Sequence, residues 1–143
     1  MYKHTQCVPP GVLAAFGTVG GLSSLFAPKA LRAVTGLSIA GALFAFRSLT
    51  VTVDGSDITL EFGNVLKVKT IPLQDIESVK VKQTHAVIGW GVHFVGDGWL
   101  YRVDGQEAVQ VKLKSGEKIF IGSDEPVELE AAINSALVAH QHA

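Results

Sequence analysis

The chain has 143 residues, a net charge of −1 at pH 7 and one cysteine. This length allows one domain with a sizeable core plus a short appendage, and it leaves little room for a second domain. A single cysteine excludes an intramolecular disulfide, and no second cysteine stands at metal-binding spacing, so we expect no structural metal site. We also expect no nucleic-acid partner.

The charges are divided at Arg47. Up to this residue the chain has four basic residues and no acidic one. Beyond it, thirteen carboxylates face eight Lys and Arg, which gives that part a charge of −5. An acid-free apolar region bracketed by basic residues is typical of a membrane-inserted segment, because a carboxylate in hydrocarbon is costly whereas Lys and Arg can reach the interface.

Two uncharged apolar segments, residues 11–27 and 33–46, make up most of the first part. Seventeen residues of helix measure about 25 Å, slightly less than the roughly 30 Å of a hydrocarbon core. Pro9 and Pro10 can open the first helix, and the second is expected from about Lys29 to Arg47. Counted in this way both helices span, which predicts a transmembrane helical hairpin in residues 1–47 with membrane lipid around residues 11–46.

Small residues recur at four-residue spacing in both apolar segments. Such spacing lets two helices approach closely, so the hairpin is expected to pack on itself or on a second copy. The alternative is a pair of buried helices packed on the rest of the chain. The spaced pairs are Gly17 and Gly21, Gly20 and Ser24, Gly36 and Ala40, and Gly41 and Ala45.

Residues 48–143 follow a different pattern, in which apolar and polar residues alternate in short runs. Alternation of this kind predicts strands with one buried face, and the turn at residues 54–57 predicts a hairpin. We expect seven strands. Their inward residues are Leu49, Val51 and Val53; Ile58, Leu60 and Phe62; Leu66 and Val68; Val79 and Val81; Trp99, Tyr101 and Val103; Val109, Val111 and Leu113; Ile119 and Ile121.

The last element is predicted to be a helix. Asp124 or Glu125 is placed to cap it and Pro126 falls in its first turn. One face carries only apolar residues, which predicts an amphipathic helix that closes over the strands. These residues are Leu129, Ile133, Ala136 and Leu137.

The chain resembles small bacterial membrane proteins that carry a pleckstrin-homology-like (PH-like) domain after two transmembrane helices. The matching stretches are residues 48–63, residues 71–76 followed by Val79 and Val81, residues 89–91 and residues 122–126. The resemblance implies an α+β fold: a seven-stranded, partly open antiparallel barrel in residues 48–143, capped by the C-terminal helix and preceded by the helical hairpin. It also implies a place in the cell membrane with the PH-like domain facing the cytoplasm.

Four lysines are the first candidate site. Lys67, Lys69, Lys80 and Lys82 form one basic face if the third and fourth predicted strands pair, and such a face can meet anionic lipid headgroups. The alternative is a solvated outer face whose lysines guard a strand edge against unwanted pairing.

Aromatic residues supply the second candidate. Trp90, between two glycines in the long loop 84–98, is either a binding aromatic or a plug for the mouth of the barrel. Trp99 and Tyr101 follow the strand alternation and are expected in the core.

No catalytic motif is present, so we expect a protein without catalysis, cofactor or metal. The predicted function is a membrane-anchored binding or assembly module that recruits a protein partner or forms a homo-oligomer, through a strand edge or the groove beside the closing helix. One alternative is an anionic lipid-headgroup sensor that uses the four lysines. Another is a metal-dependent hydrolase at His85, His93 and Asp97.

Overall fold

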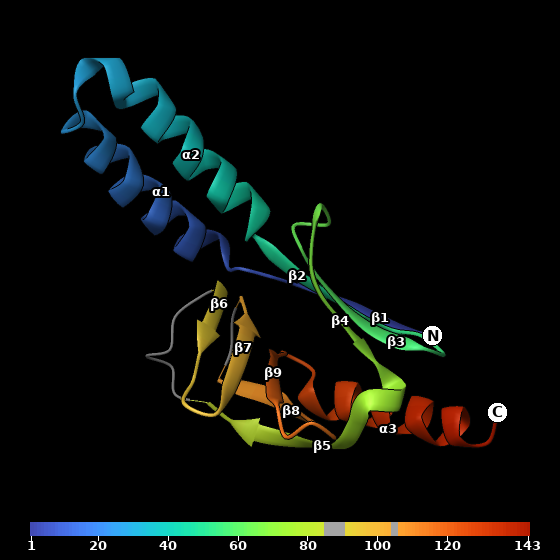
Figure 1. The fold of residues 1–143 in the computed structure, drawn as a ribbon. Helices are drawn as coiled ribbons and strands as arrows, with labels where there is room; N and C mark the ends of the chain where they lie inside the picture. The colour runs from blue at the N-terminus through green and yellow to red at the C-terminus, as the bar shows by residue number, and fades with distance from the viewer. Residues whose placement is uncertain (85–90, 104–105) are drawn as a thin grey trace.

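The computed structural model describes residues 1–84, 91–103 and 106–143. It has an α+β architecture with two sheets, a C-terminal helix and two helices that project from the sheets (Figure 1), which confirms the predicted class. The elements are β1 (Tyr2–Cys7), α1 (Pro10–Leu25), η1 (Lys29–Leu31), α2 (Arg32–Ala45), β2 (Ser48–Val53), β3 (Asp57–Phe62), β4 (Leu66–Pro72), η2 (Leu73–Asp75), β5 (Ile76–Gln83), β6 (Gly91–Phe94), β7 (Gly98–Arg102), β8 (Glu107–Leu113), β9 (Lys118–Gly122) and α3 (Pro126–Gln141).

The strands form two separate sheets. Sheet A has the order β1-β2-β3-β4 and is antiparallel throughout. Sheet B has the order β5-β8-β9-β7-β6, in which β9 lies between β8 and β7 and pairs with β7 in parallel. The described strands therefore form no closed barrel, and β1 and β6 add to the seven strands that were expected. The purely antiparallel arrangement implied by the resemblance is wrong at β7 and β9.

The core lies between the two sheets and under α3. The alternating residues of β2 and β3 are buried as predicted, and they belong to one cluster with the inner residues of β8 and β9. Leu129 and Ile133 of α3 belong to the same cluster, which confirms the predicted apolar face of that helix. Trp99 is an exception, because its side chain is 44% exposed whereas its neighbour Leu100 is fully buried.

The prediction that a helical hairpin begins the chain is wrong. The first element is β1, which pairs with β2 in a register that runs from Tyr2 opposite Val53 to Cys7 opposite Ser48. The two projecting helices are inserted between these paired strands, and the Val8 N–H donates a hydrogen bond of 2.8 Å to the Arg47 carbonyl oxygen where they leave the sheet. The division expected at Arg47 thus separates β1 from the sheet to which it belongs.

The predicted membrane spans are also wrong. The helices have 16 and 14 residues, because α2 begins only at Arg32, after Pro28 and the short 3₁₀ turn η1, and ends at Ala45. No helix in the described ranges is both long and apolar enough to cross a membrane. Three predictions depend on these spans: the resemblance to a bacterial PH-like membrane protein, the transmembrane hairpin and the location in the cell membrane. All three are wrong for the same reason.

Gln6 fastens β1 to the rest of the core. Its side chain is buried; Nε2 donates a hydrogen bond of 2.6 Å to the Gly122 carbonyl oxygen, and Oε1 accepts one of 3.0 Å from the Asp124 N–H. Gln6→Ala leaves both backbone groups without this partner, so we expect it to lower the free energy of unfolding by about 2 kcal/mol. Denaturant titration measures the change, with Lys3→Ala, an exposed position on the same strand, as the control. Equal stability of the two variants would contradict this role for Gln6.

Candidate functional site

The most unusual surface belongs to the two inserted helices. We call residues 10–45, which comprise α1, η1 and α2, the helical arm, and the remainder of the chain the module. The described residues include eighteen exposed large hydrophobic side chains, and ten of these lie on the arm. They are Val12, Phe16, Val19, Leu22, Leu25, Phe26, Leu31, Val34, Leu37 and Phe44.

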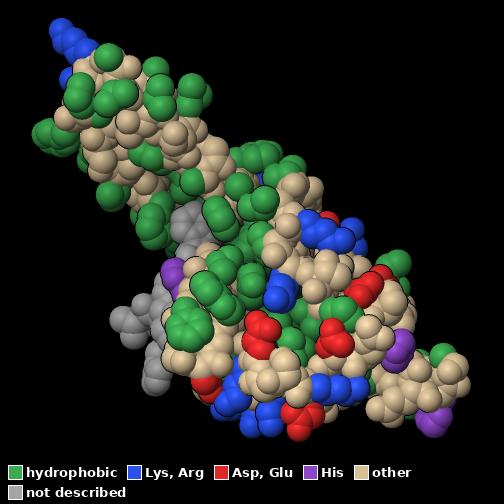
Figure 2. All heavy atoms as spheres, viewed as in Figure 1, with side chains coloured by type: hydrophobic (Ala, Val, Ile, Leu, Met, Phe, Trp, Pro, Cys, Tyr) green, Lys and Arg blue, Asp and Glu red, His purple; other side chains and the backbone are tan. Residues whose placement is uncertain are grey.

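The arm separates apolar surface from charge. Figure 2 shows hydrophobic side chains along the arm, basic side chains at its tip and the carboxylates on the module. The tip cations are Lys29 and Arg32, and the Arg32 Nε donates a hydrogen bond of 3.1 Å to the Ala27 carbonyl oxygen. None of the residues of α1 or α2 is buried in the chain itself. An apolar patch of this kind marks an interaction surface more often than a free one.

Glycines bring the two helices of the arm together. A Cβ atom at Gly20 would lie 2.7 Å from Cγ2 of Ile39, so only glycine permits this approach between α1 and α2. A Cβ atom at Gly21, Gly36 or Gly41 would meet no such neighbour within 4 Å, and these three positions face open space. The predicted close packing of small residues is therefore found at Gly20, whereas Gly21, Gly36 and Gly41 leave room on the surface.

An apolar groove runs along the middle of the arm. It has a volume of about 270 Å³. Its lining residues come from both helices, near the centre of each. They are Gly17, Gly20, Gly21, Gly36, Ile39, Ala40 and Leu43. The groove contains no charged side chain, so it suits a large apolar side chain of another molecule.

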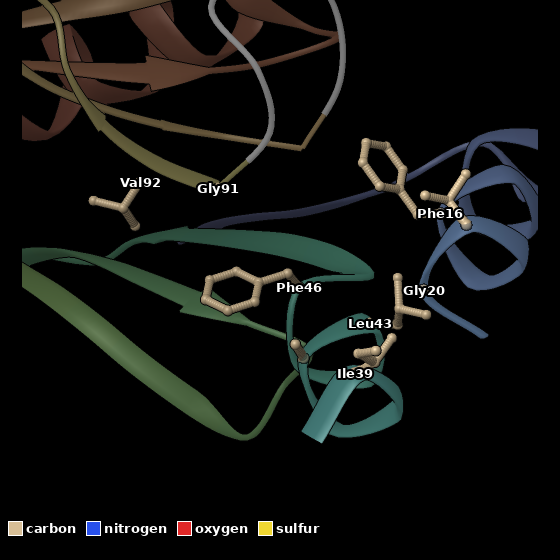
Figure 3. A pocket seen from close by; sticks show the side chains of 9 residues that line it. Phe16, Gly20, Ile39, Leu43, Phe46, Gly91 and Val92 are labelled. Carbon is tan, nitrogen blue, oxygen red and sulfur yellow. The ribbon is translucent and has the colours of Figure 1, made fainter. Parts of the chain in front are cut away.

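A second apolar pocket lies between the root of the arm and β6 and has a volume of about 500 Å³. Figure 3 shows side chains of the arm, including Phe16 and Leu43, on one side of it and Val92 of β6 on the other. Phe46, which also lines the pocket, packs on Phe62 of β3 with 4.9 Å between ring centroids. The pocket thus joins the exposed surface of the arm to that of the module.

The root of the arm is held by contacts with β3 and with the arm's own last turn. Gly63, directly after β3, has a φ of +61° and lies against the end of α2, where a Cβ atom would be 2.6 Å from the Ala45 carbonyl oxygen. The Arg47 guanidinium lies over the Phe44 ring, 4.3 Å from its centroid. These contacts give the arm a defined direction relative to sheet A.

The four candidate lysines do not lie on one pair of strands. Lys67 and Lys69 are on β4, at one edge of sheet A, whereas Lys80 and Lys82 are on β5, at one edge of sheet B. β4 pairs with β3 and β5 pairs with β8, so the pairing on which a joint basic face depends is not found. Lys69 also lies 3.8 Å from the Glu117 carboxylate. Lipid binding by these lysines stays a prediction.

The structure describes two of the three residues of the hydrolase alternative, His93 and Asp97. Trp90 and His85 lie outside the described residues. His93 is on β6, and Asp97 follows it in the turn before β7, where a hydrogen bond of 2.6 Å from the Lys118 Nζ lowers the pKa of the Asp97 carboxyl. Within the described residues, no three His, Cys, Asp or Glu side chains are grouped to hold a metal ion.

Sequence reasoning missed a polar cluster between β1 and the start of α3. The His4 Nε2 lies 2.7 Å from the Asp124 carboxylate and its Nδ1 lies 3.3 Å from the Glu125 carboxylate. The Tyr2 hydroxyl donates a 3.5 Å hydrogen bond to Glu125. The alternation of Tyr2, His4 and Gln6 was the available signal, but these side chains are amphipathic or polar and do not read as a buried strand face.

Burial raises the pKa of Tyr2 to about 12, and the negative charge of Glu125 adds to the shift. Because this pKa is above the ordinary value of 10.0, the fold favours the neutral hydroxyl. The resulting stability is complete below pH 10 and is lost as the pH rises toward 12. We expect Tyr2→Phe to reduce this loss. The free energy of unfolding, measured below pH 10 and near pH 12, gives its size in each chain. A loss as large in the variant as in the wild-type chain would contradict the assignment.

No protein-family model matches the chain, and a search of curated proteins finds no matching relative.

Proposed function

We propose that this chain is a non-catalytic assembly module whose helical arm binds another protein chain. The observation that carries the proposal is the arm itself, a projecting pair of helices whose one charged residue is Arg32 at the start of α2 and whose apolar side chains are exposed along its length. Apolar surface gains roughly 25 cal/mol for each Å² that is removed from water, so such a surface favours a partner that covers it.

The size of the apolar surface supports a protein partner. The ten exposed side chains of the arm are 40% to 90% accessible. A fully accessible aromatic side chain presents roughly 150–250 Å² and an aliphatic one less, so together the ten expose on the order of 1,000 Å². The largest apolar patch on a typical monomer measures about 300–600 Å², whereas one side of a stable protein interface buries about 800 Å². The arm therefore exposes enough surface for a specific interface.

The way the arm is fixed supports the same function. β1 and β2 pair along their whole lengths at its root, and Gln6 ties β1 to the β9–α3 connection. Binding by a surface already held in place avoids part of the entropy cost of ordering it. The module acts in this proposal as the support that presents the arm.

Amide hydrogen exchange of the full chain tests where the partner binds. At high protein concentration we expect amides of residues 10–45 to exchange several-fold more slowly than at low concentration, because association suppresses local opening of the helices. Amides of α3 serve as the internal control and are expected to change little. Slower exchange confined to the module would contradict the proposal.

A further inference from the structure

We infer that the partner of the arm is the arm of a second copy of this chain, aligned antiparallel to the first. This inference rests on the proposed function and specifies its partner. Three features of the described residues lead to it: the position of the basic residues, the charge of the module and the place of the groove along the arm.

The basic residues lie at the tip. Lys29 and Arg32 are the charged residues of the arm, and no carboxylate occurs before Asp54. A parallel pair of arms would bring four like charges together at one end. An antiparallel pair separates the two tips by the length of α1, about 24 Å at 1.5 Å per residue, which is well beyond the Debye length of roughly 8 Å at physiological salt.

The module supplies the opposite charge. It carries −3, because thirteen carboxylates face ten basic residues, namely the eight in residues 48–143 together with Lys3 and Arg47. In the antiparallel arrangement each cationic tip lies beside a module of net negative charge instead of beside the other cationic tip. Complementarity of this kind selects orientation and partner more than it adds affinity.

The same cations argue against lipid as the occupant. A membrane entered tip first would receive Lys29 and Arg32 at the greatest depth, and an arm of about 24 Å does not reach across a hydrocarbon core of roughly 30 Å. The tip would then stop roughly 6 Å short of the far interface, so both cations would have to reach that interface through hydrocarbon. On the surface of a second protein chain they stay in contact with water.

The groove lies where an antiparallel pair requires it. In a two-fold symmetric contact the same patch meets itself, and for antiparallel arms this patch is the middle of the arm. The groove of about 270 Å³ is centred there, with Gly21 and Gly36 open to an incoming side chain. Leu22 and Leu37 follow these glycines in the sequence and are exposed, and they are assigned here as the side chains that enter the groove of the partner. The arm thus carries both halves of a self-complementary contact.

Cysteine cross-linking tests the orientation. Cys7 is exposed at the root of the arm, and Ala30 is exposed at the tip between the two cations. The wild-type chain is mixed with the variant Cys7→Ser/Ala30→Cys and treated with a short bismaleimide, and the joined peptides are identified by mass spectrometry. We expect cross-links between positions 7 and 30 at least tenfold more abundant than those between two thiols at position 30. The control variant Cys7→Ser/Ser115→Cys carries its thiol in the β8–β9 turn and is expected to give only background cross-linking.

The outcomes separate this inference from the proposed function. A predominance of links joining position 30 to position 30 would show parallel arms and overturn the inference alone. Dimers that give no link from the root to the tip would also overturn it alone. A chain that stays monomeric and gives no links also overturns the inference alone. An arm that becomes protected from exchange only when phospholipid vesicles are added overturns both the inference and the proposed function.

Discussion

Val19→Glu combined with Leu37→Glu is expected to keep the chain monomeric at concentrations at which the wild-type chain associates. The two side chains are 64% and 74% exposed in the single chain, so their replacement leaves the fold almost unchanged. In the paired arms each loses the roughly 1.5–3 kcal/mol gained by burying a large apolar side chain, and each introduces a charge that is costly to bury. We therefore expect the Kd to rise by at least about 100-fold, which corresponds to about 2.7 kcal/mol.

A matched control separates this effect from a general effect of added charge. Val127 on α3 is also 64% exposed but lies on the module, so Val127→Glu is expected to associate like the wild-type chain. Concentration-dependent size-exclusion elution reports association, and circular dichroism verifies the fold of each variant. If the arm variant and the control elute alike, the arm is not the interface.

Gly63→Ala is expected to cause the largest loss of stability among single substitutions at the root of the arm. The positive φ of Gly63 costs alanine about 1–2 kcal/mol, and its Cβ would lie 2.6 Å and 2.9 Å from the carbonyl oxygens of Ala45 and Phe44. These are backbone atoms, so α2 or β3 has to shift, at a further cost of about 1–3 kcal/mol. We expect a total loss of about 2–5 kcal/mol in the free energy of unfolding.

Gly116 provides the comparison, because it has a φ of +92° but no atom lies within 4 Å of a Cβ built on it. Gly116→Ala therefore measures the backbone strain without the steric overlap and is expected to lose only about 1–2 kcal/mol. Denaturant unfolding at a concentration that keeps both variants monomeric gives the two values. A loss at Gly63 no greater than that at Gly116 would show that α2 does not press against the end of β3.

The parts of the fold that were predicted correctly have a strong local signal. Leu49, Val51 and Val53 alternate with polar residues, and they are buried together on one face of β2. The helix face formed by Leu129 and Ile133 is equally clear, and it is buried as expected. In both cases the side-chain period of a single element determines which face meets the core.

The parts that were missed depend on contacts between distant segments. β1 presents polar or amphipathic side chains to the interior, and its partners Gly122 and Asp124 are more than 100 residues away in sequence. The insertion of β9 between β8 and β7 likewise cannot be read from alternation, which is the same for parallel and antiparallel neighbours. Local periodicity identifies strands but leaves their order open.

The sequence identified the apolar segments that form the arm but not the length of its helices. The uncharged segments and their glycines were recognised, and the apolar surface they form is the main feature of the arm. The length of the second helix was overestimated, because η1 occupies Lys29–Leu31 and α2 ends at Ala45, whereas Lys29 to Arg47 had been counted as helix. The strand pairing assumed for the basic face is not found, because Lys69 and Lys80 lie on edge strands of different sheets.

Sedimentation equilibrium of the full chain, in buffer without detergent or lipid, tests most directly whether a second copy covers the arm. The account predicts a mass that rises with concentration from the 15.2 kDa of one chain to twice that value. A mass of one chain over the whole concentration range would contradict it.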